Sequence, residues 1–438
     1  MAPPSSHAVE RLLIRRGLVV NPAAHTEEVA DILIEGGVIR QVGRVSAPPK
    51  GAETEVIDAS GLVVSPGLVD MHVHLREPGN EEKETIASGS AAAVAGGVTT
   101  VAVMPNTSPP VDNVASAEFV ILQGARAGKA NILPIATVTK NRAGEELAEI
   151  GRLAQAGAVA FSDDGAPVQN AEVMRRALTY AKMFKKPVIN HCEDLTLAGE
   201  GVMHEGFVST KLGLAGIPAA AEEIMVERDI ALAEATGGHI HIAHVSTARA
   251  IDAIRRGKAR GVRVTAEVTP HHLTLIDEQA SDYNANFKMN PPLRTRLDVE
   301  AAAAGLADGT IDAIASDHAP HSHDEKEMEF SRAPFGVIGM ETTLAVVWTA
   351  LGKTRRATWK QLLAHLSTAP ARILGLSGKG FIAPGADADM TLIDPRKEWT
   401  VDPARFFSKS RNWPYAGQRL TAKAVITIVG GQIKYREI

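Results

Sequence analysis

The pattern of apolar and polar positions changes twice along the chain. Residues 9–64 and 389–435 hold short alternating apolar runs, with Gly36-Gly37 in the first stretch and Gly430-Gly431 in the second. Alternation is the period of a strand with one buried face, and Gly-Gly between two such runs is typical of a hairpin turn. The two ends of the chain are therefore predicted to build one small β domain together.

The stretch between these ends alternates apolar runs with helical segments. Strands are expected at 68–73, 98–104, 132–138, 158–161, 188–189, 240–245, 262–268 and 311–314. Helices are expected at 85–95, 116–127, 145–156, 171–185, 219–235, 247–256 and 297–307. Eight strands alternating with helices predict an α/β protein with a (β/α)8 TIM barrel rather than an open sheet. The predicted domains are the barrel at 66–375 and a small β-sandwich built from 1–65 and 376–438.

Composition narrows the class of protein. The 438 residues are 45% hydrophobic and 22% charged, and the net charge of -5 comes without any long basic run, so no nucleic-acid partner is expected. The sequence lacks an apolar run long enough for a transmembrane helix, and residues 1–10 lack the apolar stretch of a secretory signal. A single cysteine, Cys192, excludes an internal disulfide and a multi-thiolate zinc site, and it fits a cytoplasmic protein.

Metal-ligand residue types stand at the ends of five of the eight predicted strands. The active site of a TIM barrel lies where the strands end. His72 and His74 are two residues apart on a strand, so they share one face and can bind one ion together. Imidazoles and carboxylates without thiolates favour a catalytic zinc or a similar metal. Two metals sharing a bridging carboxylate would use the whole set, which is His72, His74, Asp164, His191, His244 and Asp317.

A lone histidine on a strand is more often structural than a metal ligand. The prediction of a metal site therefore depends on all six candidate ligands together. His239 and His241 alternate with isoleucines and are predicted to face away from His244, toward the helices. Asp163 stands beside Asp164 and is the competing candidate for the bridging carboxylate.

Longer motifs surround these candidate ligands. They are PGLVDMHVHLREPG at 66–79, MPNT at 104–107, SDDG at 162–165, NHCED at 190–194, AHVST at 243–247, EVTPHH at 267–272, FKMNPPLR at 287–294, SDHAPH at 316–321, APFG at 333–336 and PGADAD at 384–389. In this order and spacing, which span nearly the whole chain, they resemble the type I bacterial dihydroorotases of the amidohydrolase superfamily.

The resemblance implies a zinc enzyme of pyrimidine biosynthesis. Its reaction is the reversible cyclisation of N-carbamoyl-L-aspartate to L-dihydroorotate by a metal-activated hydroxide, the third step toward UMP. One or two Zn²⁺ per subunit are implied, with two favoured. His72, His74, Asp164 and Asp317 would hold the first zinc, and Asp164 would bridge to a second zinc held by His191 and His244. Asp317 would also carry the proton. Many relatives have a carboxylated lysine as the bridge, but residues 158–164 contain no lysine.

The resemblance also implies a binding site for a small acidic substrate. A guanidinium fork suits a carboxylate, and Arg76 would supply it. The other implied substrate contacts are His74, Asn106, Asn290, His321 and the backbone at Phe335 and Gly336. The polar segment 318–334 is expected to act as an active-site lid. Relatives form homodimers, and some assemble with aspartate transcarbamoylase, so both assemblies are expectations for this chain.

Other functions remain open at this point. The chain could be another cyclic amidohydrolase, of the dihydropyrimidinase or allantoinase type, but the missing bridge lysine and the presence of Arg76 and Asn106 oppose this interpretation. It could be an inactive homologue that scaffolds aspartate transcarbamoylase, or a binding protein on the same barrel. The presence of all six ligand candidates opposes both.

Overall fold

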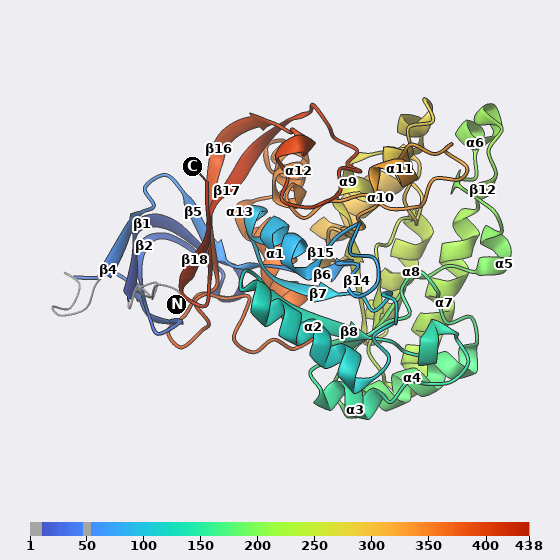
Figure 1. Ribbon diagram of the computed structural model, residues 1–438, viewed down its shortest axis with the longest axis horizontal. Helices are drawn as coiled ribbons and strands as arrows, with labels where there is room; N and C mark the ends of the chain where they lie inside the picture. Colours follow the sequence, from blue (N-terminus) through green and yellow to red (C-terminus); the bar gives the residue numbers. More distant parts are fainter. Residues whose placement is uncertain (1–10, 47–53, 438) are drawn as a thin grey trace, which may run out of the picture.

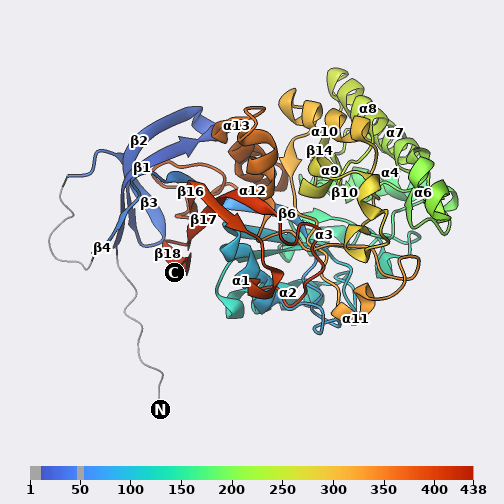
Figure 2. The same cartoon turned by 90° about the horizontal axis from the view of Figure 1, so that it is seen from above.

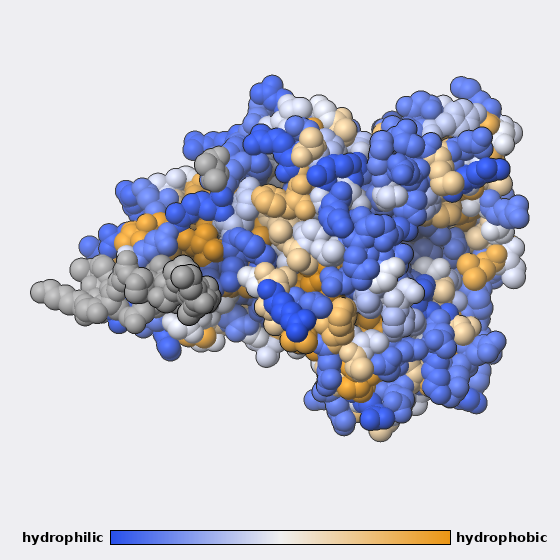
Figure 3. Space-filling model, in the orientation of Figure 1, coloured by the Kyte–Doolittle hydropathy of each residue, from blue (hydrophilic) through white to orange (hydrophobic). Residues whose placement is uncertain are grey.

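The computed structural model describes residues 11–46 and 54–437. Residues 1–10, where no secretory signal was expected, lie outside the described residues. Figure 1 shows two parts, a β sheet that contains both ends of the described chain and a larger unit of strands surrounded by helices. None of the helices in the described ranges combines the length and apolarity that crossing a membrane requires. The face in Figure 3 is mainly hydrophilic, with apolar side chains in separate small groups.

Eight parallel strands form a barrel in the larger unit. In spatial order they run from β15 back to β6, each paired with its neighbours. Backbone contacts between Val73 and His318 bring the first and last strands together and close the barrel. The strands are β6 (Leu68–Val73), β7 (Val98–Val103), β8 (Asn131–Ala136), β9 (Ala160–Phe161), β10 (Val188–Asn190), β13 (Ile240–Ile242), β14 (Val264–Val268) and β15 (Ala313–Ile314). The predicted TIM barrel is confirmed.

Helices cover the outside of the barrel, and all seven predicted helices are present. They are α1 (Ile86–Ala95), α2 (Val114–Ala127), α3 (Ile150–Gln155), α4 (Ala171–Met183), α7 (Ala219–Thr236), α8 (Ala248–Ala259) and α10 (Arg296–Ala307). Several begin where a side chain satisfies a free backbone N–H group, as Thr85 and Thr247 do for α1 and α8. Shorter helices are α5 (Leu195–Ala198), α6 (Phe207–Leu212), α9 (Pro270–Thr274), α11 (His323–Lys326), α12 (Thr343–Val347), α13 (Trp359–Leu363) and α14 (Ala369–Leu374).

The barrel strands are apolar on both faces, as parallel strands covered by helices must be. On β13, Ile240 and Ile242 pack in the large cluster that includes the helices, and Ala243 packs in the cluster inside the barrel. His239 and His241 both bind Thr265 Oγ1 at 2.8 Å, so they share one face. The prediction that they point toward the helices was therefore wrong. It assumed that the strand continues to His244, but the strand ends at Ile242 and His244 has φ +31°.

The two ends of the chain form one mixed sheet of eight strands, as predicted for a shared β unit (Figure 2). Both Gly-Gly pairs have positive φ, and they connect β2 to β3 and β17 to β18 as hairpin turns. The strands are β1 (Arg11–Asn21), β2 (Thr26–Glu35), β3 (Val38–Gly43), β4 (Thr54–Asp58), β5 (Val63–Pro66), β16 (Met390–Thr400), β17 (Arg419–Val429) and β18 (Gln432–Arg436). A separate short pair is β11 (Met203–His204) and β12 (Gly216–Ile217).

The connection between β16 and β17 reaches the barrel rim. The side chain of Asn412 donates to the carbonyls of Ala319 and Gly336 and accepts from the backbone N–H of His321. Ser408 donates its hydroxyl to Glu84, which precedes α1. A segment near the end of the chain therefore supports the loop after the last barrel strand.

Candidate metal centre and substrate site

Two histidines from β6 begin the site. His72 and His74 are 0% and 5% exposed, and their Nε2 atoms lie 3.4 and 3.5 Å from the two carboxylate oxygens of Asp164. Asp317 follows β15 and lies 3.1 Å from His74 Nε2. The three residues His72, His74 and Asp164 form one group with the spacing of metal ligands.

A second group shares Asp164. His191 follows β10, His244 follows β13, and their ring nitrogens approach to 3.0 Å. Asp164 Oδ1 lies 3.8 Å from His244 Nε2, and Asp164, His191 and His244 have the spacing of metal ligands. The six candidate ligands thus lie together as the sequence predicted, with Asp164 common to both groups.

The orientation of the first two histidine rings fits a cation at the centre. Glu267 Oε1 lies 2.6 Å from His72 Nδ1, and Asn106 Oδ1 lies 2.8 Å from His74 Nδ1. Both oxygens accept, so both Nδ1 atoms carry a proton and both Nε2 atoms face the centre. His72 Nε2 and Asp164 Oδ1 are buried without a hydrogen-bond partner. Buried polar atoms need a partner, and a divalent cation between these atoms would supply one.

The chemistry of the donors also fits such a metal. Four imidazoles and two carboxylates without a thiolate suit zinc. Cys192 is buried near Asn190 and Asp229 and belongs to neither group of candidate ligands. Both His244 and Asp317 have positive φ, at +31° and +46°. Non-glycine residues rarely adopt this strained conformation, which persists where a functional site requires it.

Glu267 is a site residue to which sequence reasoning assigned no role. It lies on β14 with no exposed surface and contacts His72 Nδ1 and His241 Nε2, the latter at 3.2 Å. Burial would raise its pKa, but the charges of His72 and His241 and their hydrogen bonds lower it to about 2. An ionised Glu267 therefore fixes the ring of His72. The EVTPHH motif contains this residue, but its distance of 195 positions from His72 gave no local signal.

Asp163 has a different place from its neighbour. Its carboxylate accepts from the backbone N–H groups of Val138 and Thr139 and from the Thr139 hydroxyl. These bonds hold the loop after β8. The geometry therefore favours Asp164 as the shared carboxylate.

Comparison with known proteins agrees with this geometry. Residues 61–250 match the family described as "Dihydro-orotase-like", and residues 212–435 match the "Amidohydrolase family". A dihydroorotase of Pelotomaculum thermopropionicum is 55% identical over 97% of this chain and 98% of its own length. A dihydroorotase of Pelobacter propionicus is 54% identical over 97% and 99%. The chain belongs to the dihydroorotase family.

Solved structures with the same fold include hydantoinases. The L-hydantoinase of Arthrobacter aurescens superimposes with a TM-score of 0.86 at 23% identity, covering 97% of this chain and 96% of the hydantoinase. The D-hydantoinase of a Thermus species has a TM-score of 0.79 at 27% identity, covering 97% and 95%. The first of these likenesses shows the fold alone, whereas the dihydroorotases share more than half of their residues with this chain.

Four of the residues expected to bind substrate in this dihydroorotase-family chain lie together. The Nη2 atom of Arg76 lies 3.3 Å from His321 Nε2, and its Nε donates to the carbonyl of Pro320. His321 Nε2 also lies 2.8 Å from the carbonyl of Phe335, which Gly336 follows. Burial lowers the pKa of Arg76 from its ordinary value, although Asp317 and Asp164 act in the opposite direction. The guanidinium therefore lies within the field of the metal-ligand carboxylates.

The two expected asparagines contact metal-ligand candidates. Asn106 binds His74 as described, and Asn290 donates to both oxygens of Glu193 at 3.1 Å and lies 3.4 Å from His191 Nε2. Asn290 Oδ1 is buried without a partner. Each asparagine thus has an orienting contact in addition to its expected role with substrate.

Two buried lysines, Lys288 and Lys326, hold the segment 318–334 in place, a role that the sequence analysis did not assign to either. Lys326 Nζ lies within 3.3 Å of the carbonyls of Lys288, Pro334 and Gly336, which match the three N–H bonds of an ammonium. Lys288 Nζ donates to the carbonyls of Phe330 and Ser331. Both lysines hold this loop to the FKMNPPLR segment, and opening of the segment as a lid stays a prediction.

Proposed function

We propose that this chain is a zinc-dependent dihydroorotase that interconverts N-carbamoyl-L-aspartate and L-dihydroorotate. The observation that carries the proposal is the set of six buried candidate ligands, in which Asp164 belongs to both groups, combined with Arg76 beside them. Sequence identities of 50–55% to dihydroorotases over nearly the full chain support the substrate.

The proposed metal content is two Zn²⁺ per chain. His72, His74, Asp164 and Asp317 would hold the first, and Asp164, His191 and His244 would hold the second. A bound metal would supply an activated water and polarise the reacting carbonyl. Aspartate as the bridge would make the site independent of carbon dioxide, which a carboxylated lysine requires.

Asp317 is the proposed proton carrier. Burial would raise its pKa, but the charge of His72 and the contact with His74 Nε2 lower it below the usual range. An ionised Asp317 can accept the proton of the attacking water and deliver it to the leaving amide nitrogen during ring opening. The same carboxyl group would move the proton in the opposite direction during cyclisation.

The side chains near Arg76 would fix the orientation of substrate. Arg76 offers two parallel N–H donors to the carboxylate that does not react. His321, the backbone at Phe335 and Gly336, Asn106 and Asn290 would supply the remaining polar contacts. Because the ligand residues are at most 6% exposed, the site excludes bulk water and its electrostatic interactions are strong.

A substrate panel tests this proposal directly. Purified chain loaded with zinc is assayed on dihydroorotate, dihydrouracil, hydantoin and allantoin. The kcat/KM for dihydroorotate is expected to exceed that for each of the other three substrates by at least about 100-fold. Those substrates are neutral, so they would leave the charge of Arg76 unpaired. Faster turnover of dihydrouracil or hydantoin would contradict the assignment, and no turnover of any substrate would favour an inactive scaffold.

Domain division, assembly and location are further proposals. We divide the chain at residues 65 and 375, so that both ends belong to the β unit. A homodimer or a complex with aspartate transcarbamoylase, and a cytoplasmic location, are proposed from the family resemblance. Size-exclusion chromatography with light scattering, with and without the transcarbamoylase, tests the assembly.

A further inference from the structure

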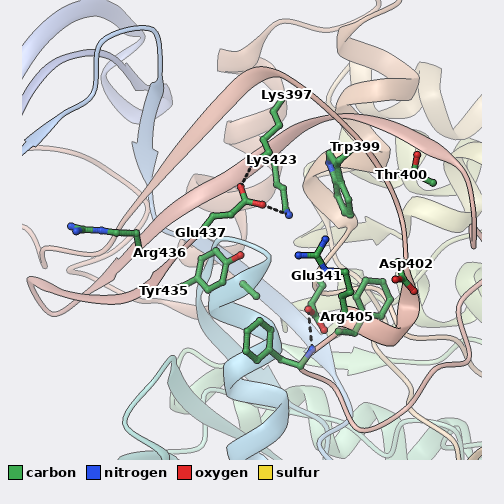
Figure 4. A pocket seen from close by; sticks show the side chains of 13 residues that line it. Glu341, Lys397, Trp399, Thr400, Asp402, Arg405, Lys423, Tyr435, Arg436 and Glu437 are labelled. Carbon is green, nitrogen blue, oxygen red and sulfur yellow. Dashed lines mark hydrogen bonds and ion pairs between the residues drawn. The ribbon is translucent and has the colours of Figure 1, made fainter.

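A pocket lies at the contact between the β sheet and the barrel unit. It has a volume of about 490 Å³ and contains none of the six ligand candidates. Its walls come from β16, β17 and β18, from the connection after β16, and from Ala95 and Glu341 of the barrel unit (Figure 4). This volume lies within the range of small-molecule sites.

The charges in this pocket favour an anion. Lys397 and Lys423 share the single carboxylate of Glu437. The guanidinium of Arg405 forms no hydrogen bond or ion pair with any residue of the described ranges, and Figure 4 shows this side chain directed between Tyr435 and Trp399. The two other acids of the pocket are engaged with backbone N–H groups, Asp402 with that of Ala404 and Glu341 with those of Phe407 and Ser408.

The remaining walls are aromatic. Trp399, Phe406, Phe407 and Tyr435 line the pocket, and Phe407 is 53% exposed. Lys423 Nζ lies 4.8 Å from the centre of the Trp399 ring, and the rings of Phe407 and Tyr435 meet edge to face. Aromatic faces beside cations are the features that bind a planar ring attached to a phosphate.

The pocket is connected to the active site by residues 405–412. The carboxylate of Glu341 accepts hydrogen bonds from the backbone N–H groups of Phe407 and Ser408 at 3.2 and 3.1 Å. Ser408 donates to Glu84, and Glu84 lies 3.3 Å from His318, next to the proposed proton carrier. Asn412 then binds His321 and the carbonyl of Gly336. One short segment therefore contacts both the pocket and the substrate side of the barrel rim.

We propose that this pocket is a second ligand site, which binds a small anion with a planar ring, of the nucleoside monophosphate class. Arg405 and the two lysines would hold the phosphate, and the aromatic walls would hold the base. A bound ligand would shift residues 405–412 and so change the affinity of the active site for its substrate.

Isothermal titration of the full chain with UMP, AMP, uridine and inorganic phosphate tests the site. Saturable binding is expected for a nucleotide, and weaker binding for uridine and phosphate. Arg405→Gln should weaken nucleotide binding by about 10- to 100-fold, because it removes a charge-assisted contact. Phe407→Ala should weaken binding of the nucleotide but not of phosphate. Arg396→Gln, an exposed arginine on β16 outside the pocket, is the matched control and should bind as the wild type does.

Two results would overturn this site. They are the absence of saturable nucleotide binding, and equal affinities for phosphate and nucleotide. The connection to the active site is tested separately and rests on the proposed function. A saturating nucleotide should change KM for dihydroorotate in the wild type and in Arg396→Gln, but not in Arg405→Gln. Nucleotide binding without any change in KM would refute the connection. Because the titration measures binding without turnover, it would still detect the site if the proposed function were wrong.

Discussion

Replacement of Glu267 by glutamine should weaken metal binding although Glu267 is not a ligand. Its carboxylate accepts from His72 Nδ1 at 2.6 Å, and its other oxygen lies 3.2 Å from the buried Nε2 of His241. The amide of Gln has one accepting oxygen, so it can hold one of the two rings and presents N–H to the other. Residues that orient a metal ligand typically contribute about 10- to 100-fold to metal affinity. The same loss in zinc affinity is expected here.

The variant should also be less stable without metal. One buried N–H group without an acceptor costs about 1–3 kcal/mol, so the free energy of unfolding of the metal-free chain should fall by about that amount. Zinc affinity is measured by competition with a chromophoric chelator, and stability by urea unfolding. Asp389→Asn is the matched control. That buried carboxylate binds Lys379, Asn131 and Gly430 beside the β sheet, so its loss should lower stability and leave zinc affinity unchanged. Equal zinc affinity of Glu267→Gln and wild type would refute the orienting role.

Four further outcomes are expected. Asp317→Asn should lower kcat by at least about 100-fold while the chain keeps at least one zinc, and a kcat above about a tenth of wild type would remove Asp317 from proton transfer. Arg76→Met should raise KM by about 10- to 100-fold, and an unchanged KM would exclude its carboxylate contact. Burial raises the pKa of Glu341 from 4.5 to about 7, so its proton stabilises the folded chain at low pH, and this contribution is lost as pH rises from about 4.5 to 7. The free energy of unfolding of Glu341→Gln should lack this dependence on pH, so its difference from wild type should change by about 3 kcal/mol between about pH 4.5 and 7. Parallel curves of unfolding free energy against pH for the two proteins would contradict this expectation. Cyclisation consumes one proton, so the ratio of ring to open form should fall about tenfold per pH unit, and a ratio that is flat between about pH 6 and 9 would be inconsistent with this reaction.

Local sequence patterns predicted the barrel well. The apolar runs correspond to strands because parallel strands under helices are buried on both faces, and the Gly-Gly pairs mark hairpins because only glycine adopts their positive φ without strain. The candidate ligands could be found because barrel chemistry lies at strand ends, which the run boundaries located. His72-x-His74 was visible because both residues lie on one strand.

The features that sequence reasoning missed depend on distant contacts or on local departures from ideal geometry. His241 was assigned to the wrong face because strand alternation stops at Ile242, and periodicity alone does not report a positive φ at His244. Glu267 orients His72 across 195 positions, and Asn412 supports His321 across 91. Such pairs have no spacing that would distinguish them in a single sequence.

The most direct test of the two-metal site with an aspartate bridge is zinc reconstitution in buffer free of carbon dioxide. The chain is stripped of metal, titrated with zinc, and assayed for dihydroorotate hydrolysis and bound zinc on the same samples. Activity is expected to rise with zinc, to level off at two zinc ions per chain, and to be unchanged by added bicarbonate. Full activity without metal, or activity that appears only when bicarbonate is present, would contradict the account.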